Sequence, residues 1–429
     1  MQFKLTKKEK SWILYDVGNS AFVLMVSTIL PVYFNYLAQN AGVSDVDYLA
    51  YWGYAASIST LIVAVLGPVM GTLADTRGFK KPLFLSCILV GCAGCLLMGL
   101  TTWWISFLVI FIIAKVGFHS SLVFYDSMLS DVTTPERMDR VSSFGYAWGY
   151  AGSCIPFVVS LVFVLGYQKM GLSFETGMMI AFAVVAVWWL VMSLSLMKQY
   201  RQVHYVERKS HAMRESVGRI IETLRSVRKQ KKIFLFLIAF FFFIDGVYTI
   251  IDMATAYGSA LGLDSTGLLL ALLVTQFVAF PFSILFGRLA EKYDTGKLIL
   301  TCIAAYTGIT VFAVFMKAQW QFWVLAIFVG MFQGGIQALS RSYFAKIVPP
   351  ERSGEYFGLM DICGKGASFM GTTVVGLASQ AFGSINIGVS AIVFLFLAGA
   401  LFFMKTEHSG SESMKNQENI VMGQQMFHD

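Results

Sequence analysis

Long apolar runs separated by short polar segments dominate the pattern of this 429-residue chain. Twelve runs are long enough to cross a bilayer, because a membrane-spanning helix needs about 20 mostly apolar residues. Their approximate bounds are 12–38, 50–74, 83–101, 104–127, 143–167, 176–197, 233–258, 265–287, 297–316, 320–342, 356–380 and 385–404. Lipid offers a backbone no hydrogen-bond partners, so each run is expected to be helical. The sequence therefore predicts an all-α membrane protein with twelve transmembrane helices.

A short internal repeat divides these helices into two halves. Residues 71–83 read GTLADTRGFKKPL and residues 287–298 read GRLAEKYDTGKL, so that Asp75 corresponds to Glu291. Both copies follow the second apolar run of their half. Internal repeats around a site near the middle of the membrane are a feature of secondary transporters. We therefore expect two pseudo-symmetric six-helix halves.

Four parts follow from this pattern. Residues 1–197 form the first half, 198–232 a basic linker, 233–405 the second half and 406–429 a polar tail expected to be disordered. Within the linker, apolar residues repeat at helical spacing over 217–227. This spacing predicts an amphipathic helix on the inner leaflet, with its basic face toward anionic lipid. A solvated linker without a specific partner is the alternative.

Positive charge is distributed unevenly between the two sides of the predicted bundle. Of the 32 Lys and Arg residues, twenty-eight fall on the side of both termini and two, Lys169 and Lys317, on the other. Cytoplasmic loops carry an excess of Lys and Arg, so both termini are expected to be cytoplasmic. The basic residues behind the net charge of +7 follow this rule in each predicted loop, so this charge does not indicate nucleic-acid binding. Only 13% of the residues are charged, against about 25% in soluble domains.

Signatures of enzymes and cofactor sites are absent from the sequence. We find no Walker loop, no cluster with metal-ligand spacing and no nucleophile motif. Cys92 and Cys95 have an i, i+3 spacing, but no nearby His or carboxylate completes a metal site. We therefore expect no enzymatic activity, no cofactor and no metal, and we expect a monomer.

Seven charged residues lie within the predicted spans, where a charge costs about 2.5–3.5 kcal/mol on insertion scales and usually serves function. They are Asp16, Lys115, Asp126, Asp245, Asp252, Asp361 and Lys365. Several share a helix face with other polar residues in the first and fourth span of each half, so these faces are expected to line one cavity. The expected site comprises Asp16, Asn19, Lys115, His119, Asp245, Tyr248, Asp252, Gln333, Gln337 and Arg341.

Structural roles remain alternatives for several of these residues. Asp16 lies near the inner end of its span and could reach the headgroups. His119 could be an ordinary buried histidine, and Gln333 could hold two helices together. Lys115 and Asp245 lie near mid-span, which favours a cavity role in which a solute's carboxylate contacts Lys115 and its amine contacts Asp245.

The repeated loop is expected to act as a gate. Asp75 could cap or pair with a neighbouring helix end, while Lys80 and Lys81 could bind headgroups or carboxylates. Asp361 and Lys365, at i and i+4, could form an internal pair. Glycines in such a loop allow tight turns and close helix approach. The expected gating set is Gly71, Asp75, Gly78, Lys80, Lys81, Glu291, Asp361 and Lys365.

These residues resemble the major facilitator superfamily over about 12–404. Its signature loop is matched by Gly71, Leu73, Asp75, Gly78, Lys80 and Lys81, with Phe79 where a basic residue is common. Three segments resemble the branch that contains the fungal vacuolar amino-acid effluxers of autophagy and their bacterial relatives. They are WILYDVGNSAF (12–22), GGIQALSRSYF (334–344) and PPERSGEYFGLMDICGKGAS (349–368).

The resemblance implies a twelve-helix fold that works by alternating access. It implies secondary transport of a small polar or amphipathic solute, with an amino acid as one candidate and the Asp and His residues as candidates for proton coupling. The short tails indicate a bacterial plasma membrane protein. Two other functions stay open, a flippase for a lipid or lipid-linked solute and a membrane sensor or scaffold that transports nothing. Two gating loops argue against the sensor, because a static receptor does not need them.

Overall fold

The computed structural model describes residues 3–207, 225–260 and 262–425. The first half contains α1 (Lys7–Asn40), α2 (Asp45–Ala74), α3 (Lys80–Leu100), α4 (Trp104–Ser127), α6 (Met138–Gly166) and α7 (Phe174–Gln199). The second half contains α9 (Lys231–Ala260), α10 (Ser265–Leu289), α11 (Thr295–Val314), α12 (Gln319–Ile347), α13 (Ser353–Phe382) and α14 (Ile385–Gln425). Two short turns, α5 (Leu129–Val132) and the 3-10 helix η1 (Pro350–Arg352), complete the elements. The predicted all-α fold with twelve long helices is confirmed.

Eleven of the described helices are long and apolar enough to cross a membrane, and α13 is the twelfth long helix. Caps fix where several of them begin. The Thr6 hydroxyl accepts a hydrogen bond from the Glu9 N–H, and the Glu9 carboxylate accepts one from the Thr6 N–H, so that α1 starts with a capping box. Helix α13 ends at Gly383, whose φ of 62° is a left-handed conformation that suits glycine.

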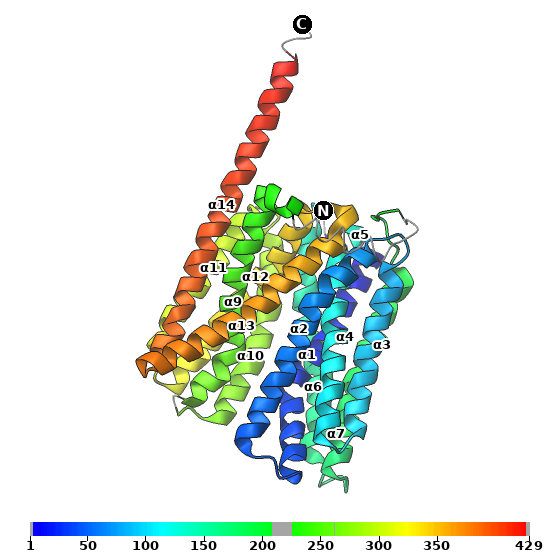
Figure 1. Ribbon diagram of the computed structural model, residues 1–429, viewed down its shortest axis with the longest axis vertical. Coiled ribbons are helices and arrows are strands. Elements are labelled where there is room, and N and C mark those ends of the chain that lie inside the picture. The colour runs from blue at the N-terminus through cyan, green and yellow to red at the C-terminus, as the bar shows by residue number, and fades with distance from the viewer. Residues whose placement is uncertain (1–2, 208–224, 261, 426–429) are drawn as a thin grey trace.

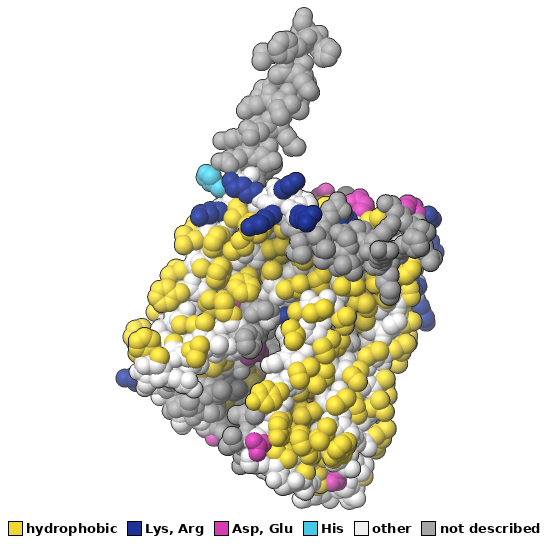
Figure 2. Space-filling model, in the orientation of Figure 1, with side chains coloured by type: hydrophobic (Ala, Val, Ile, Leu, Met, Phe, Trp, Pro, Cys, Tyr) yellow, Lys and Arg dark blue, Asp and Glu magenta, His cyan; other side chains and the backbone are white. Residues whose placement is uncertain are grey.

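The two halves stand side by side and meet along several helix pairs (Figure 1). Helix α2 packs against α13, and α6 packs against α10 and α12. Lys and Arg side chains gather at the end of the bundle where the N-terminus lies and where α14 leaves (Figure 2). We call this end, which includes Lys81, Lys231 and Lys405, the basic end, and the opposite end the far end. Between them the surface is apolar, as lipid contact requires (Figure 2).

The ends of the chain bear on two predictions. The sequence predicted a disordered tail over 406–429, whereas the backbone of α14 stays helical as far as Gln425 and projects beyond the bundle (Figure 1). A helix already nucleated by a long span adds further turns at little cost, even where the sequence is polar. The amphipathic helix predicted in the linker falls largely on 208–224, outside the described residues.

Candidate functional site

A buried arginine of α12 connects the second half to three helices of the first half. The Arg341 guanidinium lies 3.1 Å from the Asp126 carboxylate of α4 and 3.4 Å from the Asp16 carboxylate of α1. It also donates to the hydroxyl and the carbonyl of Ser142 on α6, at 2.9 and 3.0 Å. Asn19 lies one turn from Asp16 and donates to it at 3.4 Å. Two predicted site residues, Asp16 and Arg341, thus meet across the junction of the halves.

Aromatic rings and a glycine shape this arginine site. The guanidinium lies 4.5 Å from the ring centre of Trp12 and 4.4 Å from that of Tyr146, within cation–π range. A Cβ atom at Gly145 would lie 2.6 Å from the Asp16 carboxylate and 3.1 Å from the Arg341 guanidinium. Only glycine leaves room for this approach.

A second group of charges lies deeper in the bundle, on α4, α9 and α13. Lys365 donates to Asp361 across one turn of α13. The charges of Asp252 and Lys365 act on Lys115, and those of Lys115 and Lys365 act on His119. We call Lys115, His119, Asp252, Asp361 and Lys365 the mixed-charge group. Its members come from α4 of the first half and from α9 and α13 of the second half.

Asp245 does not belong to this group. Its side chain is fully buried between α9 and α13, where it accepts hydrogen bonds from the Gly371 N–H at 2.9 Å and the Thr249 hydroxyl at 3.3 Å. The acidic charge that acts on Lys115 belongs to Asp252, seven residues further along the same helix. Depth along the sequence suggested Asp245 instead, because it does not show how a helix is rotated and tilted.

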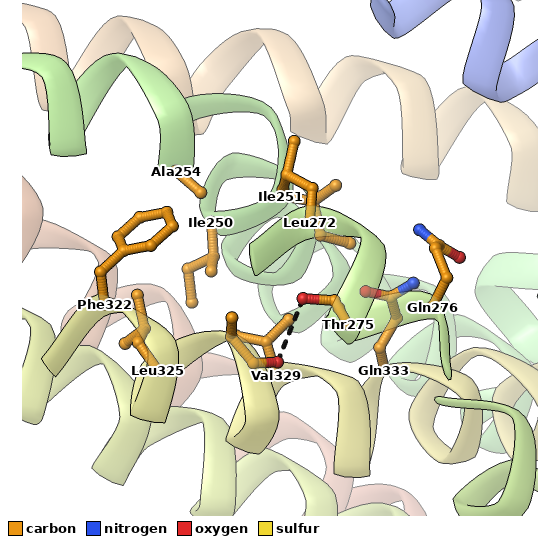
Figure 3. Close-up of a pocket in the computed structure, with 11 residues that line it drawn as sticks. Ile250, Ile251, Ala254, Leu272, Thr275, Gln276, Phe322, Leu325, Val329 and Gln333 are labelled. Atoms are coloured by element: carbon orange, nitrogen blue, oxygen red, sulfur yellow. Dashed lines mark hydrogen bonds between the residues drawn. The ribbon is translucent and has the colours of Figure 1, made fainter. Parts of the chain in front are cut away.

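Gln333, another predicted site residue, lines a pocket within the second half (Figure 3). The pocket has an empty volume of about 440 Å³ and is lined by Ile250, Ile251 and Ala254 of α9, by Leu272, Thr275 and Gln276 of α10, and by Phe322, Leu325, Ala326, Val329 and Gln333 of α12. Thr275 and the two glutamines supply its polar edge. Tyr248 and Gln337 are half-buried on α9 and α12. The largely apolar lining suits an uncharged, apolar group.

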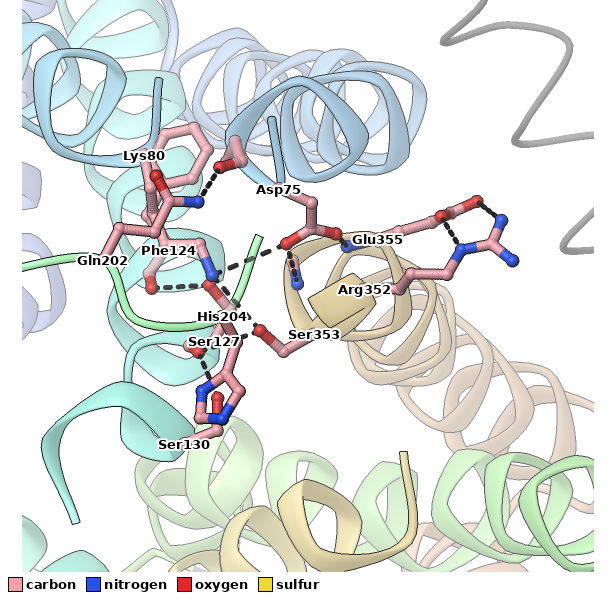
Figure 4. Close-up of polar contacts among 12 residues, drawn as sticks. Asp75, Lys80, Phe124, Ser127, Ser130, Gln202, His204, Arg352, Ser353 and Glu355 are labelled. Atoms are coloured by element: carbon pink, nitrogen blue, oxygen red, sulfur yellow. Dashed lines mark hydrogen bonds and ion pairs between the residues drawn. The ribbon is translucent and has the colours of Figure 1, made fainter. Parts of the chain in front are cut away.

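At the basic end, the repeated loop of the first half binds the start of α13 (Figure 4). The Asp75 carboxylate accepts hydrogen bonds from the Gly354 and Glu355 N–H groups at 2.8 and 2.9 Å, and thereby caps a helix of the other half. Lys80, also fully buried, lies 3.5 Å from Asp75 and donates to the Ser353 hydroxyl at 3.2 Å. We call these five residues the first inter-half cluster. Burial raises the pKa of Asp75 to about 6, against the opposing effect of the Lys80 ammonium.

The glycines and the second lysine of this loop have separate roles. A Cβ at Gly71 would lie 2.1 Å from the Gly354 carbonyl oxygen, so α2 and α13 approach this closely only because residue 71 is glycine. Gly78 has a φ of 81° and donates its N–H to Gln202. Lys81 is exposed, whereas Lys80 is buried.

Residues 200–207, at the start of the linker, lie along the same loop, and we call them the linker strap. The Val206 N–H donates to the Asp75 carbonyl, and the Arg77 N–H donates to the Val206 carbonyl. Asp131 of α5 accepts hydrogen bonds from the His204 N–H and ring and lies 3.9 Å from the Lys80 ammonium. The strap therefore connects to the first inter-half cluster through its backbone and through Asp131.

His204 and Asp131 alter each other's protonation. The hydrogen bond with Asp131 raises the pKa of His204. Burial acts to raise the pKa of Asp131, but the hydrogen bond with His204 and the charge of Lys80 outweigh it, so the pKa lies below its usual range. Both shifts favour the charged pair in this conformation.

The repeated loop of the second half binds the start of α6. Glu291 pairs with Arg140, and the Thr295 hydroxyl donates to Asp139 at 2.8 Å. Lys346 of α12 also pairs with Asp139. These residues form the second inter-half cluster, which repeats the arrangement of the first with the halves exchanged. Together the two clusters join the two halves at the basic end.

Sequence reasoning missed several of these residues. Asp139 was missed although it precedes Glu355 by the same interval that separates Asp75 from Glu291, so the repeat itself could have found it. Asp131 and His204 carry no sequence signal of this kind, because the strap meets α5 only in the folded chain.

A two-half helical bundle with matched inter-half contacts at one end defines a transporter of the major facilitator class. The chain belongs to the vacuole effluxer Atg22-like family, whose model matches residues 5–136 and 130–414. By family and fold it is a multi-pass secondary transporter of the membrane.

Relatives and solved structures agree with this assignment. The chain is 39% identical over 424 residues to the uncharacterized MFS-type transporter YxiO of Bacillus subtilis, covering 98% of this chain and 99% of that protein. It is 25% identical to autophagy-related protein 22-2 of Aspergillus clavatus over 61% of this chain, but spans only 46% of that relative's length. Its fold matches the fucose:proton symporter FucP of E. coli with a TM-score of 0.70 at 14% identity, covering 93% of this chain and 97% of that one.

Proposed function

We propose that the chain moves a small polar or amphipathic solute, with an amino acid as the first candidate, across a bacterial plasma membrane by alternating access, driven by protons. The observation that carries this proposal is the pair of inter-half clusters. Each consists of a repeated loop of one half bound to a helix start of the other half. Contacts of this kind have to break when the halves rock, and two clusters in corresponding positions of the two halves suit such a motion.

The solute class follows from the mixed-charge group. Lys115 and Lys365 offer positive charge to a carboxylate, and Asp252 and Asp361 offer negative charge to an amine. A zwitterion satisfies both kinds of group, whereas a simple cation or anion satisfies one. The apolar pocket within the second half would accept a small uncharged group. The name of the matching family, an effluxer, favours a transported solute, and the name of a structural neighbour, a proton symporter, favours a proton gradient.

The orientation follows from charge. With the basic end in the cytoplasm, the two inter-half clusters act as the inner gate, and both termini are cytoplasmic. Anionic lipid along the linker and a monomeric state belong to the same proposal. Cysteines placed at Arg77 and at Lys317 test it in intact cells, because an impermeant reagent should reach position 317 and not position 77. Labelling of position 77 from outside would invert the orientation.

Counterflow in proteoliposomes tests transport itself. Vesicles loaded with unlabelled amino acids should accumulate the labelled amino acid only when they contain the protein, and the uptake should saturate. The Asp75→Ala variant, which removes the helix cap far from the mixed-charge group, is the matched control and should bind solute without exchanging it. Binding without counterflow in the wild type would favour a sensor. Movement of labelled lipid between leaflets, with no amino-acid counterflow, would favour a flippase.

A further inference from the structure

Asp245 of α9 is a fully buried acid that stands apart from every other charge described above. One of its carboxyl oxygens accepts the hydrogen bonds from Gly371 and Thr249. The other oxygen is buried and, among the described residues, has no hydrogen-bond partner. From α14, the third helix at this place, the ring of Phe396 packs against the neighbouring Gly246. Among the described residues, neither oxygen of this carboxyl has a cation as its hydrogen-bond partner.

This environment suits a neutral acid. An ionised carboxylate with a bare oxygen and no cation is costly in an apolar interior, whereas a protonated carboxyl group is tolerated there. The carbonyl oxygen of a protonated acid still accepts the two hydrogen bonds that are observed. We propose that Asp245 is the proton-binding site of the transport cycle and holds its proton while the basic end is closed. The proposal rests on the proton-driven transport proposed above and adds the residue that carries the proton.

Helix α13 connects this acid to the inner gate. The helix starts at Ser353, where Asp75 caps it, and reaches Gly371 about 27 Å further on. A Cβ at residue 371 would lie 2.3 Å from the nearer Asp245 oxygen, so glycine allows the acid to touch the backbone of α13. When α13 leaves Asp75 as the basic end opens, its contact with Asp245 loosens and water can enter. The acid then releases its proton to the side that has opened, leaving an ionised carboxylate that water solvates.

Infrared spectroscopy tests the protonation directly. Purified wild-type protein at neutral pH should show the C=O stretch of a protonated carboxyl group at Asp245, and Asp245→Asn should lose this absorption. The matched control, Thr249→Val, keeps the acid and removes one of its hydrogen bonds, so the band should persist at a shifted frequency. Equal absorption by wild type and Asp245→Asn would overturn the proposal, because another acid would then be the source of the band.

Transport assays test the coupling. In proteoliposomes, Asp245→Asn should keep counterflow within about threefold of wild type and lose about tenfold or more of the uptake driven by a pH gradient. Full gradient-driven uptake by this variant, or loss of its counterflow to the same degree, would overturn the role of Asp245. Wild-type counterflow without any response to a pH gradient would overturn the proton site and leave transport standing. Absence of wild-type counterflow would overturn transport itself, whatever the infrared result.

Discussion

The Arg341 guanidinium of α12 and the Asp126 carboxylate of α4 lie 3.1 Å apart and join the two halves beneath the basic end. The Asp16 carboxylate pairs with the same guanidinium, so one cation serves the buried Asp16 and the partly exposed Asp126. The members of this cluster come from different halves, and the contact therefore exists only while the halves are close. It adds a third connection, deeper in the bundle, to the two inter-half clusters.

Removing the arginine should destabilise the protein strongly. Arg341→Ala leaves the buried Asp16 without its cation, and breaking a buried pair in this way costs about 3–5 kcal/mol, while the partly exposed Asp126 adds less. Arg341→Lys keeps the charge but not the forked geometry, so we expect an intermediate loss. Thermal unfolding of the purified variants measures both. Adding Asp126→Asn to Arg341→Ala should recover part of the loss, and simple additivity of the two changes would contradict the shared site.

The helix cap at α13 should control the closed state rather than solute affinity. Asp75→Ala removes two hydrogen bonds to a charged acceptor, each worth about 1.5–3 kcal/mol, so the basic end should open. Spin labels at the exposed residues Lys81 and Lys292 would report a longer distance, while solute binding stays close to wild type. Glu291→Gln should have a smaller effect, because Glu291 is 44% exposed and such pairs contribute about 0–1 kcal/mol. Equal effects of the two changes would contradict the different burial of the two clusters.

Acidification should favour the closed basic end through the linker strap. Asp131 raises the pKa of His204. The charged His204 therefore stabilises the closed basic end fully below the usual histidine pKa of about 6.5, and this stabilisation is lost as the pH rises through the raised pKa. The lowered pKa of Asp131 keeps this acid ionised throughout that window. The spin-label distance should therefore lengthen as the pH rises above about 6.5.

His204→Gln is the variant that isolates the strap in this measurement. It should flatten the pH dependence when introduced into an Asp245→Asn background, where the buried acid no longer titrates. An unchanged pH profile in the double variant would show that the strap does not act on the gate.

Sequence alone predicted the fold and the position of the repeated loops, and it failed where helices of different halves meet. Hydrophobic run length and the internal repeat are properties of the chain, so the helices and the Asp75–Glu291 correspondence could be read directly. The joining of Arg341 to Asp126, and of Asp131 to His204, depends on helix rotation and on contacts between distant segments. The sequence pointed to Asp245 as the acid near Lys115, whereas the charge of Asp252 acts on Lys115. This error has the same cause, because the two acids lie two turns apart on one helix and the sequence does not show how that helix is rotated.

The mixed-charge group should bind the two ends of a zwitterion separately. Lys115→Ala removes a charged donor to the carboxylate, worth about 1.5–3 kcal/mol, and should weaken binding about 10- to 100-fold. Asp252→Asn should weaken binding similarly by reducing the attraction to the amine. Lys115→Arg keeps both the charge and a long side chain, so it should retain most of the affinity. It is therefore the matched control for Lys115→Ala.

Two solute analogues separate these roles from a general disturbance of the bundle. Binding of an analogue that lacks the carboxylate should be insensitive to Lys115→Ala, because it has no group for the lysine to contact. Binding of an analogue that lacks the amine should likewise be insensitive to Asp252→Asn. Calorimetric titration of the two analogues against wild type and both variants gives the full comparison. If each variant weakened both analogues equally, Lys115 and Asp252 would support the structure of the cavity instead of contacting the solute, because a direct contact is lost only with the group that it binds.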